Sequence, residues 1–166
     1  SKEVEELLGE IKGQMAAHVH EDVMANLFHR DFKKQVEGIK ELAEFAPGHA
    51  QEVTENLDLL LRLCALRLAG KLANTTVVLS ILEFLKSLLD LLVAHDYRLS
   101  EAEATVLMPC LMEEVGSNSD GVRKHIRELL KKATQVYPAS KIFGFAMDTL
   151  HCTRNQRSRA ENLSEM

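Results

Sequence analysis

Apolar residues recur every three or four positions through most of the chain, with polar residues between them. The clearest case is residues 117–136, in which the recurring apolar residues are Val122, Ile126, Leu129, Ala133 and Val136. This spacing places them on one face of an amphipathic helix. The polar run Asn-Ser-Asp at 118–120 offers side chains that cap helix N-termini, so a helix is predicted to begin here.

A second helix is predicted immediately before it, over residues 104–116. Gly116 is a suitable C-terminal cap for this helix. Only a few residues connect the two helices, which therefore must pack antiparallel as a hairpin.

The same unit is predicted three more times along the chain. The paired helices are 21–28 with 33–45, 50–69 with 75–94, and 139–152 with 156–166. The polar residues at the turns, Asp31, Asn74, Asp120 and Asn155, are 43, 46 and 35 residues apart. Helical units of about 40 to 47 residues are typical of HEAT and armadillo repeats, which stack into solenoids because one unit cannot bury its own apolar face.

The predicted fold is therefore all-α, a HEAT-repeat α-solenoid of about four hairpins. We expect residues 1–17 to form a leading helix that caps the first repeat. The repeats are predicted at 18–48, 49–98, 99–138 and 139–166. The sequence ends within the repeat pattern without a polar closing helix, so we expect the array to continue beyond it.

Two stretches, 57–68 and 77–93, are apolar almost all round. A helix with neighbours on both sides has this composition. A membrane-associated pair is the weaker interpretation, because charged residues such as Asp58 and Lys86 interrupt both stretches. No apolar run reaches the roughly 18 to 20 residues that a membrane span needs.

The net charge and the cysteines indicate which partners and which cellular compartment to expect. The formal net charge of −5 argues against a general nucleic-acid binder, for which a basic balance is expected. The cysteines Cys64, Cys110 and Cys152 are odd in number and lie among apolar residues. We expect three buried thiols in a reducing compartment.

The sequence contains no constellation that predicts catalysis or a bound cofactor. It has no glycine-rich phosphate loop, no GxSxG, no HExxH and no CxxC. His18 or His20 with Asp22 is only a weak metal pair, and surface histidines before a helix are common. We therefore predict no enzymatic activity, no metal and no cofactor.

The turns inside the hairpins are rich in basic residues. These are Arg30, Lys33 and Lys34 in the first turn, Lys71 in the second, Arg123 and Lys124 in the third, and Arg154, Arg157 and Arg159 in the fourth. Only Asp31 and Asp120 are acidic there. Since the N-terminal end of a helix dipole favours acidic residues, this repeated enrichment indicates function.

Equivalent turns of a solenoid line up along one edge. We therefore predict a narrow basic ridge on an acidic protein, suited to an acidic protein partner. The simpler alternative is that these residues only pair with neighbouring acids. Phe32, in the first turn, is either buried under the leading helix or exposed as an apolar anchor.

Several segments resemble one known family. FKKQVEGIKEL (32–42), NTTVVLSILEFLKSL (74–88), SDGVRKHIRELL (119–130), VYPASKIFGFAMD (136–148) and TRNQRSRAENLSEM (153–166) resemble successive repeats of a TOG domain. The resemblance is to the ch-TOG, Mini spindles and Dis family of microtubule polymerases, and most closely to its fourth TOG domain. It covers nearly the whole chain from about residue 19.

The resemblance implies a non-enzymatic module whose intra-repeat turns bind curved αβ-tubulin, the early repeats facing the β subunit. The residues that it places at that surface are Phe32, Lys33, Asn74, Thr75, Arg123, Arg154, Asn155 and Arg159. The basic turns described above add Lys34, Lys71, Lys124 and Arg157 as predicted tubulin-binding residues. It also implies a cytoplasmic, cytoskeletal protein at microtubule plus ends, the spindle, and centrosomes or spindle poles.

Three positions depart from the family pattern. Phe32 replaces the usual tryptophan, Gln35 stands where arginine is usual, and Lys71-Leu72 is unusual in the second turn. The resemblance favours a tubulin-binding module that promotes plus-end growth. The alternative is a HEAT-repeat adaptor that binds a protein partner through its concave helix face.

Overall fold

The described residues form helices and no strand. The computed structural model describes the backbone of residues 2–69 and 73–164, and the side chains of residues 2–69 and 73–152. Three hairpins form the body: α2 (Glu21–Leu27) with α3 (Phe32–Phe45), α5 (Leu57–Leu68) with α6 (Thr75–Ala94), and α7 (Glu101–Glu114) with α8 (Asp120–Ala133). Helix α1 (Lys2–Met15) precedes them and α9 (Ala139–Ser164) follows them.

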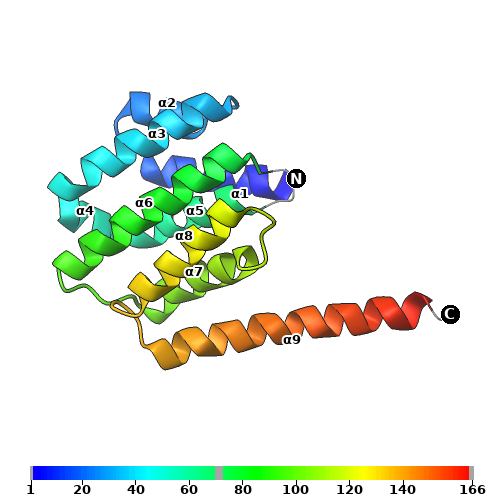
Figure 1. Ribbon diagram of the computed structural model, residues 1–166. Coiled ribbons are helices and arrows are strands. Elements are labelled where there is room, and N and C mark those ends of the chain that lie inside the picture. The colour runs from blue at the N-terminus through cyan, green and yellow to red at the C-terminus, as the bar shows by residue number, and fades with distance from the viewer. Residues whose placement is uncertain (1, 70–72, 165–166) are drawn as a thin grey trace.

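The helices lie in two layers. Helices α3, α6 and α8 run side by side in one layer, and α1, α5, α7 and α9 form the other (Figure 1). Each second helix of a hairpin therefore packs on the second helix of the next. This arrangement confirms the predicted solenoid of antiparallel hairpins.

The core lies between the layers and is built mainly from leucine. The largest fully buried side chains are Leu57, Leu61, Ile81, Leu82, Leu85, Leu88, Leu89, Leu92, Leu107, Met108, Leu111 and Ile126. The five apolar residues predicted on one face of residues 117–136 are all at most 3% exposed. No helix in the described part of the chain is long and apolar enough to cross a membrane.

The helix predicted over residues 50–69 is divided at Asn56 in the structure. A short 3-10 helix, η1 (Ala46–His49), leads into α4 (Ala50–Glu55), and α5 then begins at Leu57. The Asn56 side chain donates a hydrogen bond to the Glu52 carbonyl at 2.9 Å. The Asn56 backbone amide donates to the same carbonyl at 3.1 Å, so both bonds meet at the end of α4.

The fourth predicted hairpin is wrong. Residues 139–164 form the single helix α9, with no turn near Asn155. The segment 153–164 contains no glycine or proline that would end a helix. Helix α9 packs against α7 and then extends past the body of the molecule (Figure 1).

One expectation for the cysteines is also wrong. Cys64 is buried and Cys110 is half-buried, but Cys152 is exposed on α9. Burial raises the pKa of the Cys110 thiol to about 12, so this thiol stays protonated near neutral pH.

The first hairpin depends on a close approach of two backbones. A Cβ atom placed at Gly38 of α3 would lie 2.7 Å from the backbone nitrogen of Leu27 in α2. Because backbone atoms cannot move aside as a flexible side chain does, only glycine fits here. The same contact fixes the helices on both sides of the first turn.

We predict that Gly38→Ala lowers the free energy of unfolding by about 1 to 3 kcal/mol, the usual cost of overpacking. Urea denaturation measures the change. Gly9→Ala in α1 is the matched control, since no atom lies within 4 Å of its added Cβ. That control should be neutral or stabilising by up to about 1 kcal/mol. Equal effects of the two substitutions would contradict the close-packing account.

Candidate functional site

The turns within the three hairpins lie along one edge of the molecule. Helices α3, α6 and α8 all begin at this edge and run away from it in the same direction (Figure 1). A Cβ at Gly121, at the start of α8, would lie 3.9 Å from the Leu79 side chain near the start of α6. We call this row of turns, at residues 28–32, 73–75 and 117–121, the turn edge.

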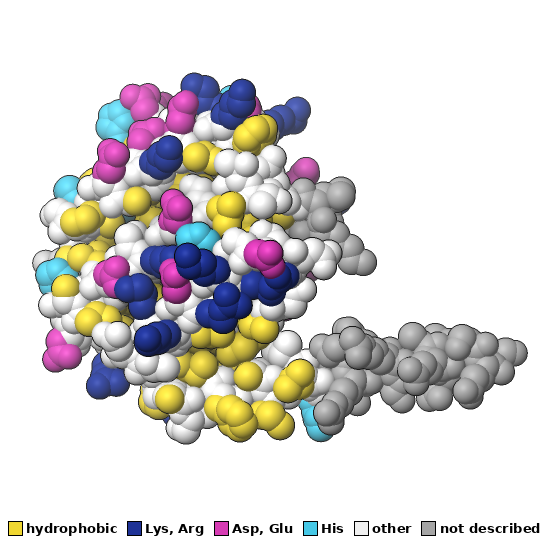
Figure 2. All heavy atoms as spheres, in the orientation of Figure 1, with side chains coloured by type: hydrophobic (Ala, Val, Ile, Leu, Met, Phe, Trp, Pro, Cys, Tyr) yellow, Lys and Arg dark blue, Asp and Glu magenta, His cyan; other side chains and the backbone are white. Residues whose placement is uncertain are grey.

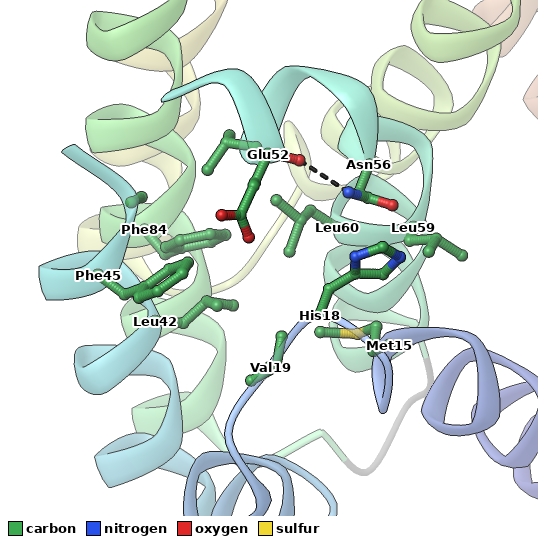
Figure 3. A pocket seen from close by; sticks show the side chains of 12 residues that line it. Met15, His18, Val19, Leu42, Phe45, Glu52, Asn56, Leu59, Leu60 and Phe84 are labelled. Carbon is green, nitrogen blue, oxygen red and sulfur yellow. Dashed lines mark hydrogen bonds between the residues drawn. The ribbon is translucent and has the colours of Figure 1, made fainter. Parts of the chain in front are cut away.

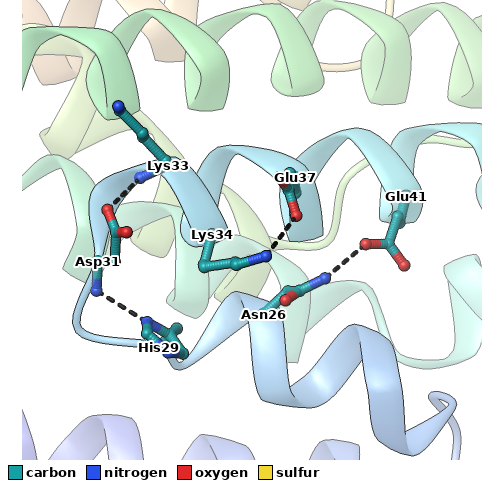
Figure 4. A network of polar contacts seen from close by, with 7 residues as sticks. All are labelled: Asn26, His29, Asp31, Lys33, Lys34, Glu37 and Glu41. Carbon is teal, nitrogen blue, oxygen red and sulfur yellow. Dashed lines mark hydrogen bonds and ion pairs between the residues drawn. The ribbon is translucent and has the colours of Figure 1, made fainter.

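Side chains of the first turn satisfy its backbone locally (Figure 4). Asp31 caps α3 by accepting a hydrogen bond from the Lys33 amide at 3.0 Å. The Asp31 amide in turn donates to His29 Nδ1 at 2.9 Å, and Gln35 Nε2 donates to the His29 carbonyl at 2.7 Å. The helix start is therefore capped without help from the basic residues.

The two lysines that follow the turn behave differently. Lys34 Nζ lies 3.4 Å from the Glu37 carboxylate in the next turn of α3. Lys33 is exposed, and its side chain points away from this network (Figure 4). Phe32 is 37% exposed. Its side chain therefore lies partly against the rest of the molecule but is not buried beneath α1.

The second turn is also capped by its own side chain. Asn74 Oδ1 accepts hydrogen bonds from the Thr76 amide at 2.9 Å and the Val77 amide at 3.4 Å. Thr75 is exposed at the first position of α6. Lys71, which the sequence placed at this turn, lies outside the described residues.

A hollow of about 350 Å³ separates the first two turns. Phe32, Arg30 and Gln35 form one side of it, and Asn74 and Val77 form the other. Its remaining walls come from Val4 and Leu8 of α1 and from Leu66, Arg67, Ala69 and Ala73. The structure thus brings Phe32 and Asn74 to one concave surface.

Arg67 at this hollow ties the first hairpin to the second. Its Nη2 donates a hydrogen bond of 2.8 Å to the Leu27 carbonyl, at the C-terminal end of α2. A carbonyl in the last turn of a helix has no partner within the helix, and arginine supplies one here. Burial lowers the pKa of the Arg67 guanidinium, although it stays charged at neutral pH.

One of the two basic residues predicted at the third turn bonds within the turn itself. Ser119 caps α8 by accepting from the Val122 amide at 3.3 Å. Arg123 folds back, donating to the Ser117 carbonyl and pairing with Asp120. Lys124 is exposed instead.

The fourth set of predicted residues is not at a turn. Arg154, Asn155, Arg157 and Arg159 fall within the continuous helix α9, and their side chains lie outside the described residues. The predicted basic side chains that the structure describes therefore lie at the first and third turns. Phe32, Lys33, Lys34, Asn74, Thr75 and Lys124 are the exposed predicted residues at the turn edge or within one helical turn of it.

The opposite edge holds a small apolar pocket (Figure 3). Its cavity of about 40 Å³ lies among the ends of α1, α3, α4 and α5, with Phe84 of α6 as one wall. His18, Glu52 and Asn56 are its polar residues, and Asn56 is occupied by its bond to the Glu52 carbonyl. We find no cluster of three metal-ligating side chains among the described residues.

Sequence reasoning missed Arg67, His29 and Gln35 as residues that shape the turn edge. A signal for Arg67 was present, because it is a charged residue within the nearly all-apolar stretch 57–68. A charge in such a helix needs a partner, and here the partner is a backbone carbonyl. His29 and Gln35 carry no comparable signal, since their roles depend on the path of the turn.

Comparisons with known proteins identify relatives of this chain. No protein-family model matches the chain. It is 39% identical over 156 residues to protein MOR1 of Oryza sativa subsp. japonica and 34% identical over 152 residues to protein mini spindles of Drosophila melanogaster. These matches cover 94% and 92% of this chain.

Solved structures give the same result. One, presented as "TOG-tubulin binding specificity promotes microtubule dynamics and mitotic spindle formation", has a TM-score of 0.78 at 32% identity and covers 87% of this chain. A TOG domain structure from C. elegans Zyg9 shares the fold, with a TM-score of 0.70. The chain belongs to the TOG-domain family of MOR1, mini spindles and Zyg9.

Members of the TOG-domain family are non-enzymatic microtubule regulators. The chain spans 8% of the length of rice MOR1, 7% of mini spindles and 55% of the first solved TOG chain. The turn edge described above is thus part of a TOG fold.

We predict that Arg67→Met speeds amide hydrogen exchange in the first turn, residues 28–31, because the end of α2 loses its cap. Hydrogen exchange detected by mass spectrometry measures this rate. The free energy of unfolding should fall by about 1.5 to 3 kcal/mol, typical of a lost bond to a charged group.

Arg62→Met is the matched control for Arg67→Met. Arg62 is exposed and lies 3.8 Å from Asp58 in an (i, i+4) surface pair. Its loss should cost no more than about 0.5 kcal/mol and leave exchange in the first turn unchanged. Unchanged exchange in Arg67→Met would show that this arginine does not hold the turn.

Proposed function

We propose that this TOG segment binds αβ-tubulin through its turn edge. The observation that carries the proposal is the alignment of three intra-hairpin turns on one edge, with an exposed aromatic residue and unpaired cations. The solved TOG structure at 32% identity is described by its tubulin binding, which supports the same partner for this chain.

The chemistry of the turn edge suits a folded acidic protein. Phe32 offers an apolar surface that remains partly exposed, and Lys33 beside it has no acidic partner among the described residues. Aromatic residues at the centre of an interface commonly dominate binding, and cations around them set approach rate and register. Asn74 and Thr75 extend this surface along the edge.

The ion pairs of the predicted residues favour some of them over others as direct contacts. Lys34 and Arg123 are engaged by neighbours within their own helix or turn, so they serve the edge mainly by shaping it. Phe32, Lys33 and Lys124 are the stronger candidates for direct contact. Lys71, Arg154, Asn155, Arg157 and Arg159 stay predictions from sequence.

We further propose that these repeats face the β subunit and that the whole protein promotes plus-end microtubule growth. Growth follows if the domain binds curved tubulin more tightly than straight lattice tubulin, because only differential affinity shifts such an equilibrium. Tethering several such modules would raise the local tubulin concentration. This role fits a cytoplasmic protein at plus ends, the spindle, and centrosomes or spindle poles.

We predict that Phe32→Ala/Lys33→Glu weakens binding to soluble αβ-tubulin at least tenfold, about 1.4 kcal/mol, the loss typical of a truncated interface anchor. Sedimentation or fluorescence anisotropy at low and moderate salt measures the dissociation constant. Binding of the parent chain should weaken as salt rises, because exposed charges are screened.

Lys40→Glu is the control for this double variant. Lys40 is an exposed lysine two turns further along α3, on the helix face and away from the turn edge. It should leave tubulin affinity within about twofold, since isolated surface charges contribute little. If Lys40→Glu lost binding and Phe32→Ala/Lys33→Glu did not, the result would favour the alternative, a HEAT-repeat adaptor that binds its partner through a helix face.

A further inference from the structure

Three cations form a stripe along the outer face of α8. They are Lys124, Arg127 and Lys131, all exposed. Their spacing of three and four residues places them on one side of a helix, over about 10 Å of its length. Figure 2 shows Lys and Arg side chains gathered over this part of the molecule.

The rotation of α8 is fixed by its core residues. Val122, Ile126 and Leu129 are at most 3% exposed and face the body of the molecule. The stripe therefore faces outward from the layer of second helices. Arg127 and Lys131 lie one and two turns along the helix from the third turn, so they are distinct from the turn edge.

Two acidic residues near the stripe pair with cations outside it, although Lys124 of the stripe also attracts the Glu128 carboxylate. Glu128 pairs with Lys86 of α6, and the hydrogen bond from Lys86 lowers the pKa of the Glu128 carboxyl. Asp90 of α6 lies 2.7 Å from Lys132. These two pairs lie between α6 and α8.

Asp120, the remaining acid of α8, pairs with Arg123. No ion pair joins Lys124, Arg127 or Lys131 to an acid among the described residues. This local excess of positive charge occurs on a chain whose net charge is −5. A general basic composition therefore does not explain it.

We propose that the α8 stripe binds an extended acidic polypeptide segment with carboxylates on alternate residues. Alternate residues of an extended chain are about 6.6 Å apart and point to the same side. The cations follow one another at about 4.5 and 6 Å along the helix, and long side chains reach across the difference. An extended segment needs no pocket, which fits a stripe on the outer face of a helix layer.

The test uses a labelled peptide of alternating Glu and Ser, about twelve residues long, and a Gln-Ser peptide of the same length as its control. Fluorescence anisotropy is measured with the 166-residue chain at about 25 mM and about 300 mM salt. The Glu-Ser peptide should bind at low salt and be released at high salt. The Gln-Ser peptide should not bind.

Arg127→Glu/Lys131→Glu should weaken binding of the Glu-Ser peptide at least tenfold, because two attractive contacts become repulsive. Lys40→Glu/Arg98→Glu is the matched control. Its residues are exposed, form no ion pair among the described side chains, and give the same change in net charge. This control should stay within about threefold of the parent chain.

The milder Arg127→Gln/Lys131→Gln is the second variant, should the charge reversal disturb folding as judged by circular dichroism. Absence of binding at low salt, or equal weakening in the stripe and control variants, would overturn the proposal. Tubulin binding through the turn edge is measured separately, with the Phe32→Ala/Lys33→Glu variant. Failure of one proposal therefore does not decide the other.

Discussion

Helix α6 sets the arrangement on which the rest of the structure depends. It packs against its hairpin partner α5 and also against α3 and α8 of the neighbouring hairpins. Leu82, Leu85 and Leu88 are at most 1% exposed, so the apolar surface of this helix is covered only when all three neighbours are present. One hairpin alone would leave much of that surface in water, at a cost of about 1.5 to 3 kcal/mol for each large side chain.

This constraint produces the candidate binding surface. Because α3, α6 and α8 are each the second helix of a stacked hairpin, they run in the same direction and their N-termini arrive at one edge. Asp31, Asn74 and Ser119 cap those N-termini with their own side chains. The cations and the aromatic residue at the edge are therefore not needed to cap the helices, which is why we propose that they bind a partner.

Sequence periodicity predicted the first three hairpins and most helix ends well, since the core positions of each helix recur at helical spacing. It failed where local contacts decide the path. One helix is divided at Asn56, whose side chain and backbone amide both donate to the Glu52 carbonyl. Helix α9 stays continuous because nothing between residues 153 and 164 forces an end.

The basic residues of the turns could be counted from the sequence. Which of them form ion pairs with neighbours could not be predicted from it. Lys34 and Arg123 are as basic as Lys33 and Lys124, yet the structure gives ion pairs to the first two and none to the second two among the described residues. Which side chain folds back depends on helix rotation and on distances of a few ångströms. The link that Arg67 makes from α5 to the Leu27 carbonyl depends on tertiary contact in the same way.

Hydrogen exchange of the chain with and without soluble αβ-tubulin tests the central claim most directly. The account predicts slower exchange in peptides that cover residues 28–36, 74–79 and 118–124, and no change in the connection over residues 46–56 at the opposite edge. Protection of that connection, or of the outer helix faces alone, would contradict a turn-edge interface and show that the TOG fold is used here through another surface.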